Sequence, residues 1–111
     1  MKFSEGLKKN SDFSKVYNNG SSKANRYLVM YVMENGLGIN RLGISISKRV
    51  GNSVERHYFK RCVKESYRLH EDMFNSGLDI VVLARQGAKN IKFKDIDSAL
   101  MHLMRINKVL L

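Results

Sequence analysis

The chain has 111 residues and 43% of them are hydrophobic, which is enough for one folded domain with a single core and argues against general disorder. Twenty Lys and Arg residues against ten Asp and Glu residues give a formal net charge of +10. A charge of this size opposes compaction by self-repulsion and favours a polyanionic partner. Nucleic acid is favoured over a membrane, because the longest apolar runs are far too short to span a bilayer.

Cysteine usage and the first residues predict a cytoplasmic location. Cys62 is the only cysteine, so an internal disulfide is excluded and a reducing compartment fits. Residues 1–10 lack the apolar segment of a secretory signal. We therefore expect residues 1–111 to form one cytoplasmic domain that binds nucleic acid, with no membrane partner and no small-molecule substrate.

The first predicted elements are a basic lead-in and a short helix. Residues 1–10 are expected to be a loose lead-in. Ser11 can cap a helix over residues 12–19, which Gly20 would end. Three apolar side chains at helical spacing would share one face of this helix, namely Phe13, Val16 and Tyr17.

Two strands are predicted next. Residues 18–26 have the composition of a loop, and residues 27–33 alternate as a strand that places Tyr27 and Tyr31 on one side. Residues 41–47 alternate between large apolar and small side chains, which is typical of a half-exposed strand. We expect this second strand to pair antiparallel with the first, across the glycine-containing turn between them.

A long helix, a buried strand and a final helix complete the order. Asn52 and Glu55 resemble a capping box, and the long helix that they begin is expected to end at about Asn75. Residues 78–85 form a β-branched apolar run, typical of a central strand. Residues 93–109 predict an amphipathic helix whose apolar stripe comprises Ile96, Ala99, Leu100, Leu103 and Met104.

The order α-β-β-α-β-α, with room for a further short strand, predicts an α+β fold. Its architecture would be a two-layer α/β sandwich built on a small mixed sheet. The helices would lie on one side of the sheet, and the other face would be left partly open.

The long helix and the turn before it carry most of the charge pattern. On a helical wheel the apolar residues, among them Val54 and Tyr58, occupy one half and the basic residues the other. Four cations recur one turn apart and form a stripe, Arg56, Lys60, Lys64 and Arg68. Like charges at this spacing cost roughly 0.2–0.5 kcal/mol per pair, so the stripe needs a reason.

Two interpretations of this basic surface are open. Solvated helix faces are common, but they usually mix charges of both signs, and here Glu65, four residues after Arg61, is the obvious internal partner. Phosphate binding is the alternative that we favour, with help from the N–H groups at the helix start. The cations that it would use are Lys48, Arg49, Arg56, Lys60, Arg61, Lys64 and Arg68.

Residues 42–49, LGISISKR, lead into GNSVER at residues 51–56, followed by KR at 60–61 and KE at 64–65. This succession resembles the signature of the bacterial ribonuclease P protein subunit. The resemblance extends over most of the chain, to residues 7–17, 24–26 and 79–85.

The resemblance implies both a fold and a function. The fold is an α-β sandwich with a left-handed β-α-β crossover. The protein would be the non-catalytic subunit of an endoribonuclease, which binds the catalytic RNA and helps it to remove the 5′ leader of precursor tRNA. The RNA would perform the hydrolysis with Mg²⁺, and the protein alone would hold no metal tightly. The basic helix would contact the RNA subunit, and a cleft between the first helix and the sheet would hold the leader.

Aromatic residues supply the candidates for leader binding. A single-stranded RNA needs apolar or aromatic platforms beside cations. Aromatic residues at helical or strand spacing are core residues in most proteins, but the resemblance favours a binding role here. The residues concerned are Phe13, Tyr17, Arg26, Tyr31 and His57.

The sequence departs from the family pattern at one motif. Where the family usually has Arg-Asn-Arg, this chain has Arg56, His57 and Tyr58. A neutral imidazole can donate and accept a hydrogen bond as an amide does, whereas Tyr58 replaces a cation by a ring. Lys64 stands where the family often has Arg, which loses a bidentate fork.

The sequence does not support catalysis by the protein alone. Asp95 and Asp97 are a close pair of acids, but acids in the first turn of a helix simply suit its dipole. His57 and His70 lie thirteen residues apart on one helix, roughly 20 Å by its rise.

Two rival hypotheses concern binding without an enzyme. One is a generic basic RNA-binding protein of ribosomal or chaperone type, without an enzyme partner. The other is a helix-turn-helix DNA-binding module, which the single long basic helix argues against.

Overall fold

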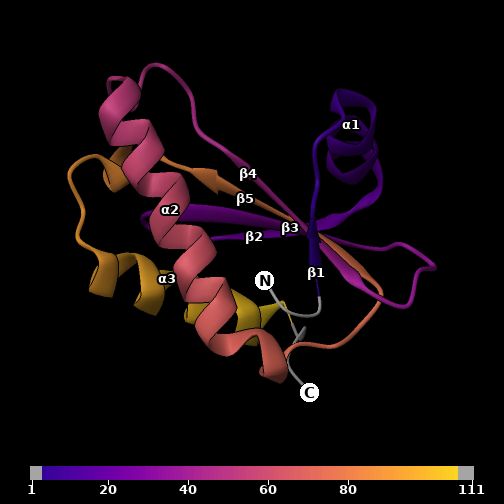
Figure 1. Cartoon of the computed structure of the whole chain (residues 1–111). Helices are drawn as coiled ribbons and strands as arrows, with labels where there is room; N and C mark the ends of the chain where they lie inside the picture. The colour runs from indigo at the N-terminus through magenta and orange to yellow at the C-terminus, as the bar shows by residue number, and fades with distance from the viewer. Residues whose placement is uncertain (1–3, 108–111) are drawn as a thin grey trace.

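A five-stranded mixed sheet forms the centre of the protein (Figure 1). The computed structural model describes residues 4–107. The strands in spatial order are β1 (Ser4–Gly6), β4 (Asn40–Ser45), β5 (Leu78–Ala84), β3 (Leu28–Glu34) and β2 (Ser21–Ala24). The first three run parallel to one another, and β3 is antiparallel to both of its neighbours.

The position of β5 corrects one prediction. β4 was expected to pair with β3, but β5 lies between them, parallel to β4 and antiparallel to β3. The first five residues of β5 are all buried. A central position, with both edges paired and both faces covered, removes the most apolar surface of this strand from water. The expectation of a central strand over residues 78–85 is confirmed.

Two helices cover one face of the sheet. α2 (Ser53–His70) and α3 (Phe93–Ile106) pack against each other and against the strands, as Figure 1 shows. The buried apolar strand residues on this face are Leu28, Met30, Leu42, Leu78, Ile80 and Val82. The predicted stripe of α3 is buried throughout against them, and α3 is the final amphipathic helix that the sequence predicted. Val109, its expected last residue, lies outside the described residues.

α1 (Asn10–Asn19) lies on the opposite face of the sheet, so the helices are not all on one side as expected. Val16 is fully buried there against Val81, with the rings of Phe13 and Tyr17 partly covered beside it. The alternation of β5 explains the arrangement, because Val81 faces α1 while its neighbours Ile80 and Val82 face α2 and α3. α1 covers part of this face, and the rest is left open.

The crossover from β4 through α2 to β5 is left-handed. The backbone N–H of Arg85 donates to the carbonyl oxygen of Tyr27, so the odd-numbered residues of β5 hydrogen-bond towards β3. Leu83 is one of these residues and it faces α1. The molecule is now viewed from the α1 side with β5 running upward. Because the residues are L-amino acids, β3 then lies to the right of β5 and β4 to its left. Since α2 lies behind the sheet in that view, the turn is left-handed, whereas about 98% of such crossovers are right-handed.

A buried carboxylate ties α1 to the sheet. The guanidinium of Arg41 on β4 donates to both carboxylate oxygens of Asp79 on β5, at 2.8 and 2.6 Å, and lies 3.6 Å from Asp12 on α1. The Asn35 amide donates to the same Asp79 carboxylate. Burial alone raises the pKa of Asp79, but these hydrogen bonds outweigh it and hold that pKa below its ordinary value.

Several predicted boundaries shift. Ser4–Gly6 forms β1, and the next residue, Leu7, is buried, so this part of the lead-in is ordered. The predicted loop over residues 18–26 contains β2. α1 begins before Ser11 and has Lys9 at its N-cap position, without a side-chain cap. α2 ends at His70, followed by a short 3₁₀ turn.

The long helix also exposes apolar residues that the wheel placed on its core side. Val54, Tyr58, Leu69 and Met73 are all exposed, and Val54 keeps 76% of its surface accessible. The core side of α2 is narrower and consists of Phe59, Cys62, Val63, Ser66 and Tyr67. No helix in the described part of the chain is long and apolar enough to cross a membrane.

Candidate nucleic-acid interface

The start of α2 is fixed by a capping box, as the sequence predicted. The Asn52 side chain accepts a hydrogen bond from the Glu55 N–H at 2.9 Å, and the Glu55 carboxylate accepts one from the Asn52 N–H at 3.0 Å. Two N–H groups at the helix start are therefore satisfied by side chains and are not free for a phosphate. Just before the cap, the Val50 N–H donates to the Ser47 carbonyl and closes the turn that carries Lys48 and Arg49.

The basic stripe on α2 is not uniform along its length. Glu65 was expected to offer a partner to Arg61, but its carboxylate accepts both hydrogen bonds of the Arg68 fork, at 2.5 and 3.0 Å. This pairing raises the pKa of Arg68 and lowers that of Glu65. Arg68, at the end of the stripe, is already neutralised by a protein carboxylate.

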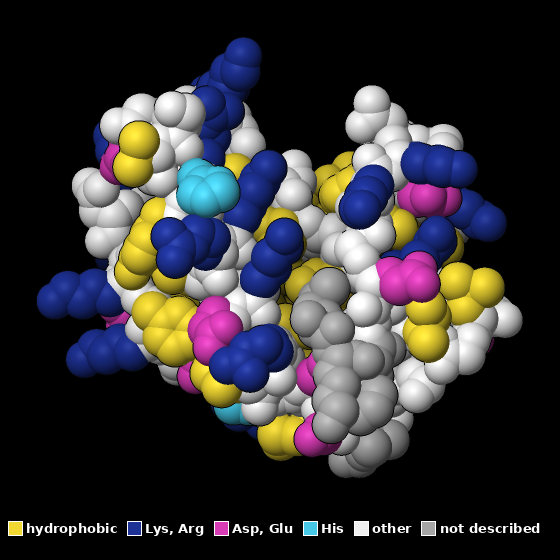
Figure 2. All heavy atoms as spheres, viewed as in Figure 1, with side chains coloured by type: hydrophobic (Ala, Val, Ile, Leu, Met, Phe, Trp, Pro, Cys, Tyr) yellow, Lys and Arg dark blue, Asp and Glu magenta, His cyan; other side chains and the backbone are white. Residues whose placement is uncertain are grey.

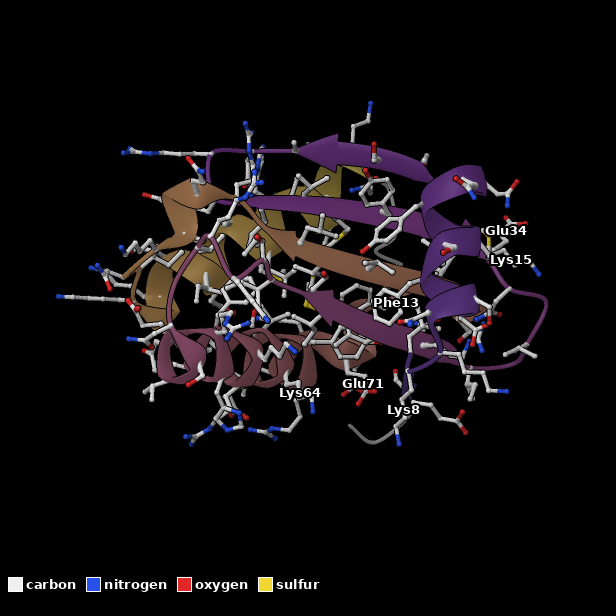
Figure 3. The ribbon with its side chains drawn as sticks, turned by 90° about the horizontal axis from the view of Figure 1, so that it is seen from above. Lys8, Phe13, Lys15, Glu34, Lys64 and Glu71 are labelled. Atoms are coloured by element: carbon white, nitrogen blue, oxygen red, sulfur yellow. The ribbon has the colours of Figure 1, made fainter. Side chains whose placement is uncertain are left out.

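The other six cations of the predicted set form no ion pair with another described residue, and they are Lys48, Arg49, Arg56, Lys60, Arg61 and Lys64. Arg56 is half-buried and its Nε lies 3.4 Å from the Asn52 carbonyl, which holds the side chain against the helix start. The other five are exposed. Figure 3 shows Lys64 on the outer side of α2. Since no described carboxylate pairs with these six cations, they are available to an external polyanion.

A groove separates α1 from α2 on the open side of the sheet. Its wider part, about 350 Å³, lies between Phe13 and Tyr17 of α1 and Lys60 of α2, over the end of β4. A smaller adjoining hollow of about 200 Å³ is lined by Arg56, His57 and again Lys60. In Figure 2 the hollow between the two sides of the molecule has Lys and Arg side chains along both rims.

Aromatic rings form one wall of this groove. The Phe13 and Tyr17 ring centroids are 6.3 Å apart, and Tyr17 meets Tyr31 of β3 edge to face at 5.0 Å. Gly43 on β4 makes this packing possible, because a Cβ there would lie 2.7 Å from the Phe13 ring. Gly43 lies on the side of β4 that the alternation predicted to be exposed, but the Phe13 ring covers it and it is buried. Figure 3 shows Phe13 reaching from α1 towards the sheet.

The groove therefore brings together most of the residues predicted for leader binding. Phe13 and Tyr17 line it, Tyr31 supports Tyr17, and His57 lies in the adjoining hollow. Arg26 is not among them. It stacks on Tyr27, with its guanidinium carbon 5.5 Å from the ring centroid, and lines a separate hollow beside α3. Tyr27 packs towards α2 and α3, so it does not share a face with Tyr31 as expected.

Sequence reasoning missed several lining residues. Asn10 and Ser14 line the groove, and they follow the same helical spacing as Phe13 and Tyr17, which a wheel of α1 could have revealed. Ile46 lines both parts of the groove at the point where β4 ends. Its place at the strand end decides this exposure, and alternation alone gives no signal for it.

Comparison with known proteins identifies the family. The family model Ribonuclease P matches residues 1–108. The chain belongs to the ribonuclease P protein family. The ribonuclease P protein component of Lachnoclostridium phytofermentans is 57% identical over 107 residues, covering 96% of this chain and 92% of that protein. The component from Clostridioides difficile is 46% identical and covers 91% and 90% of the two chains.

Solved structures of this family have the same fold. The RNase P protein of Staphylococcus aureus superposes with a TM-score of 0.89 at 40% identity, covering 96% of this chain and 97% of that one. The RNase P protein from Thermotoga maritima has a TM-score of 0.82 at 30% identity and covers 89% and 94% of the two chains. The predicted α+β fold class and the family resemblance are both confirmed.

Proposed function

We propose that this protein is the RNA-binding subunit of a cytoplasmic ribonuclease P that removes the 5′ leader of precursor tRNA. The observation that carries the proposal is the continuous groove between α1 and α2, with aromatic rings on one side and cations on the other. Single-stranded RNA binds where bases can stack on rings while phosphates meet cations. The family membership supplies the RNA partner, since a ribonuclease P protein component acts as part of an endoribonuclease complex.

Two surfaces of the protein bind two different RNAs. The leader lies in the groove against Phe13 and Tyr17, with Lys60 and His57 on the opposite side. The catalytic RNA subunit lies against the outer cations of α2 and the turn before it, chiefly Lys48, Arg49, Arg61 and Lys64, with Arg56 at the junction. Arg68 contributes less, because Glu65 already neutralises it.

Hydrolysis is assigned to the RNA subunit and its Mg²⁺. Among the described residues no three His, Cys, Asp or Glu side chains are grouped so that they could hold a metal ion. Of the two acids considered from the sequence, Asp97 is engaged by other side chains. Asp97 accepts a hydrogen bond from the Ser66 hydroxyl at 2.6 Å and lies 3.1 Å from the His70 ring nitrogen, which joins α2 to α3.

A cleavage assay at low Mg²⁺ tests the proposal. A bacterial ribonuclease P RNA and a precursor tRNA are combined with and without the protein, and the protein is also tested alone. We expect the protein to raise the cleavage rate of the RNA, because its cations replace screening that Mg²⁺ would otherwise supply. We expect no cleavage by the protein alone.

Two outcomes would contradict the proposal in different ways. Cleavage by the protein alone would mean that the chain contains an active site of its own. Binding of the RNA without any effect on cleavage would favour the generic RNA-binding protein instead. A Lys60→Glu variant tests the role of the groove itself. It reverses one charge in the groove and should lower the cleavage rate of precursor tRNA.

A further inference from the structure

A second, more apolar hollow lies on the other flank of α2 and meets the groove at Ile46, where β4 ends. It has a volume of about 400 Å³, which falls within the range of roughly 300–1,000 Å³ typical of ligand sites. Val54 and Tyr58 of α2 form one wall, and Ile91 in the loop before α3 forms the other. Phe59 and Ile96 line its apolar interior. We call it the α2–α3 pocket.

Tyr58 gives this pocket an aromatic wall. The residue is 48% exposed and lines the pocket from α2. An aromatic side chain has few rotatable bonds, so stacking it on a ligand costs little conformational entropy.

The rim of the pocket is basic. Lys89 and Lys92 lie on the loop side of the pocket, and both side chains are exposed. The acidic lining residue, Glu55, is engaged in the capping box of α2. An apolar hollow edged by cations does not suit an apolar peptide without acidic residues. It suits a nucleobase, which is a flat ring with a backbone phosphate on either side.

We propose that the α2–α3 pocket takes one unstacked nucleobase of the RNA subunit, which stacks on Tyr58 while its flanking phosphates meet Lys89 and Lys92. This inference rests on the proposed function and adds a base contact to it. The RNA subunit is the expected source, because the pocket lies on the opposite flank of α2 from the groove assigned to the leader. The exposed Val54 then has a role, since it extends the apolar wall at the rim.

Salt dependence separates a stacked base from a phosphate contact. A lost phosphate contact lowers the slope of log K against log salt, by roughly 0.7–0.9 for each contact, whereas a lost stacking contact leaves the slope unchanged. We therefore expect Tyr58→Ala to weaken binding of a bacterial ribonuclease P RNA by roughly 5- to 150-fold at every salt concentration. Tyr58→Phe, which keeps the ring, should retain most of the affinity.

Two controls guard the interpretation. Leu69→Ala removes another large exposed apolar side chain of α2 that does not line the pocket, and it should leave RNA affinity unchanged. Tyr58→Leu keeps an apolar side chain at this position, which preserves folding but offers no ring, and it should behave like Tyr58→Ala. Thermal unfolding of each variant shows that the fold is intact.

Chemical probing of the RNA supplies an independent readout. With wild-type protein, dimethyl sulfate and a carbodiimide should find an unpaired base of the RNA subunit protected, and Tyr58→Leu should restore its reactivity. Unchanged affinity in the Tyr58→Ala and Tyr58→Leu variants, a reduced salt slope, or no such base would overturn the pocket inference while RNA binding by the wild type stands. If the wild-type protein does not bind the RNA at all, the proposed function fails, and this inference fails with it.

Discussion

The two faces of the sheet are built differently. On the face covered by α2 and α3, Leu28, Met30 and Val82 have no accessible surface, and they belong to a large continuous core. On the face covered by α1, the fully buried residues of the cluster are Val16 and Val81. The aromatic rings around them are only partly covered.

This difference separates stability from recognition. The large core gains its free energy by removing apolar area from water, so most of its residues have no surface left for a ligand, apart from those such as Phe59 and Ile96 at the α2–α3 pocket. The rings of Phe13 and Tyr17 on the α1 face pack against a small core and also line the groove, so both can contribute to stability and to binding. A substitution should therefore mainly affect folding on one face and mainly affect RNA binding on the other.

The largest expected effect tests the stability half of this comparison. Leu103→Ala removes a fully buried side chain of α3 and should lower the free energy of unfolding by roughly 2–5 kcal/mol. Tyr17→Ala on the α1 face should cost less, because its ring is already partly exposed. Urea denaturation of both variants measures the two values, and a larger loss for Tyr17→Ala would mean that the small core is the more important one.

The buried carboxylate on the α1 side is an exception to this division, and it predicts the next largest effect. Asp79→Asn removes the charge that Arg41 and Asn35 bind, and it should cost roughly 1.5–3 kcal/mol at neutral pH, the range for hydrogen bonds to charged groups. Arg41→Lys serves as a partner control, because it keeps the charge but loses the bidentate fork, and it should cost less.

The pH dependence of the Asp79 effect has a defined sign. The pKa of Asp79 is lower in the folded protein than its ordinary value, so its contribution is fully present above the unfolded pKa of about 3.9. It is lost as pH falls through the lower folded value. The difference in unfolding free energy between wild type and Asp79→Asn should therefore be constant at neutral pH and shrink below about pH 4. A difference that grows in acid would contradict the assignment.

The recognition half of the comparison predicts a substrate-selective effect. Tyr17→Ala should weaken binding of precursor tRNA to the reconstituted complex by roughly 1–3 kcal/mol, the value of a base stacked on an aromatic ring. Binding of mature tRNA, which has no leader, should be unchanged. Fluorescence titration with both RNAs measures this, and equal losses for the two would mean that Tyr17 acts only through the small core.

Local patterns in the sequence predicted the three helices, three of the five strands that the structure describes, and several residues of the groove. The capping box at Asn52, the buried stripe of α3 and the apolar run of β5 depend on neighbouring residues, and each is confirmed. Phe13 and Tyr17 share a face of α1 because helical spacing places them there. The family resemblance supplied the crossover, whose left hand opposes the usual preference and could not follow from periodicity.

Features that depend on distant partners were not predictable. β4 and β3 were expected to pair because they are adjacent in sequence, but β5 enters between them. Glu65 had two cations within reach on the helix, and only side-chain geometry decides that it pairs with Arg68. Arg26 is near the aromatic residues in sequence, yet the turn between β2 and β3 carries it to the α3 side.

The smallest expected effects lie along α2, whose inner flank belongs to the large core and whose outer flank carries the cations. Arg61→Ala and Lys64→Ala should each reduce the slope of log K against log salt for the RNA subunit by roughly 0.7–0.9. Their free energies of unfolding should change by no more than about 0.5 kcal/mol, as is usual for surface positions.

Arg68→Ala should reduce the slope less, because Glu65 already occupies its guanidinium. Glu65→Gln should then release Arg68 and steepen the slope, and if it has no effect while Arg68→Ala does, Arg68 binds RNA despite its partner.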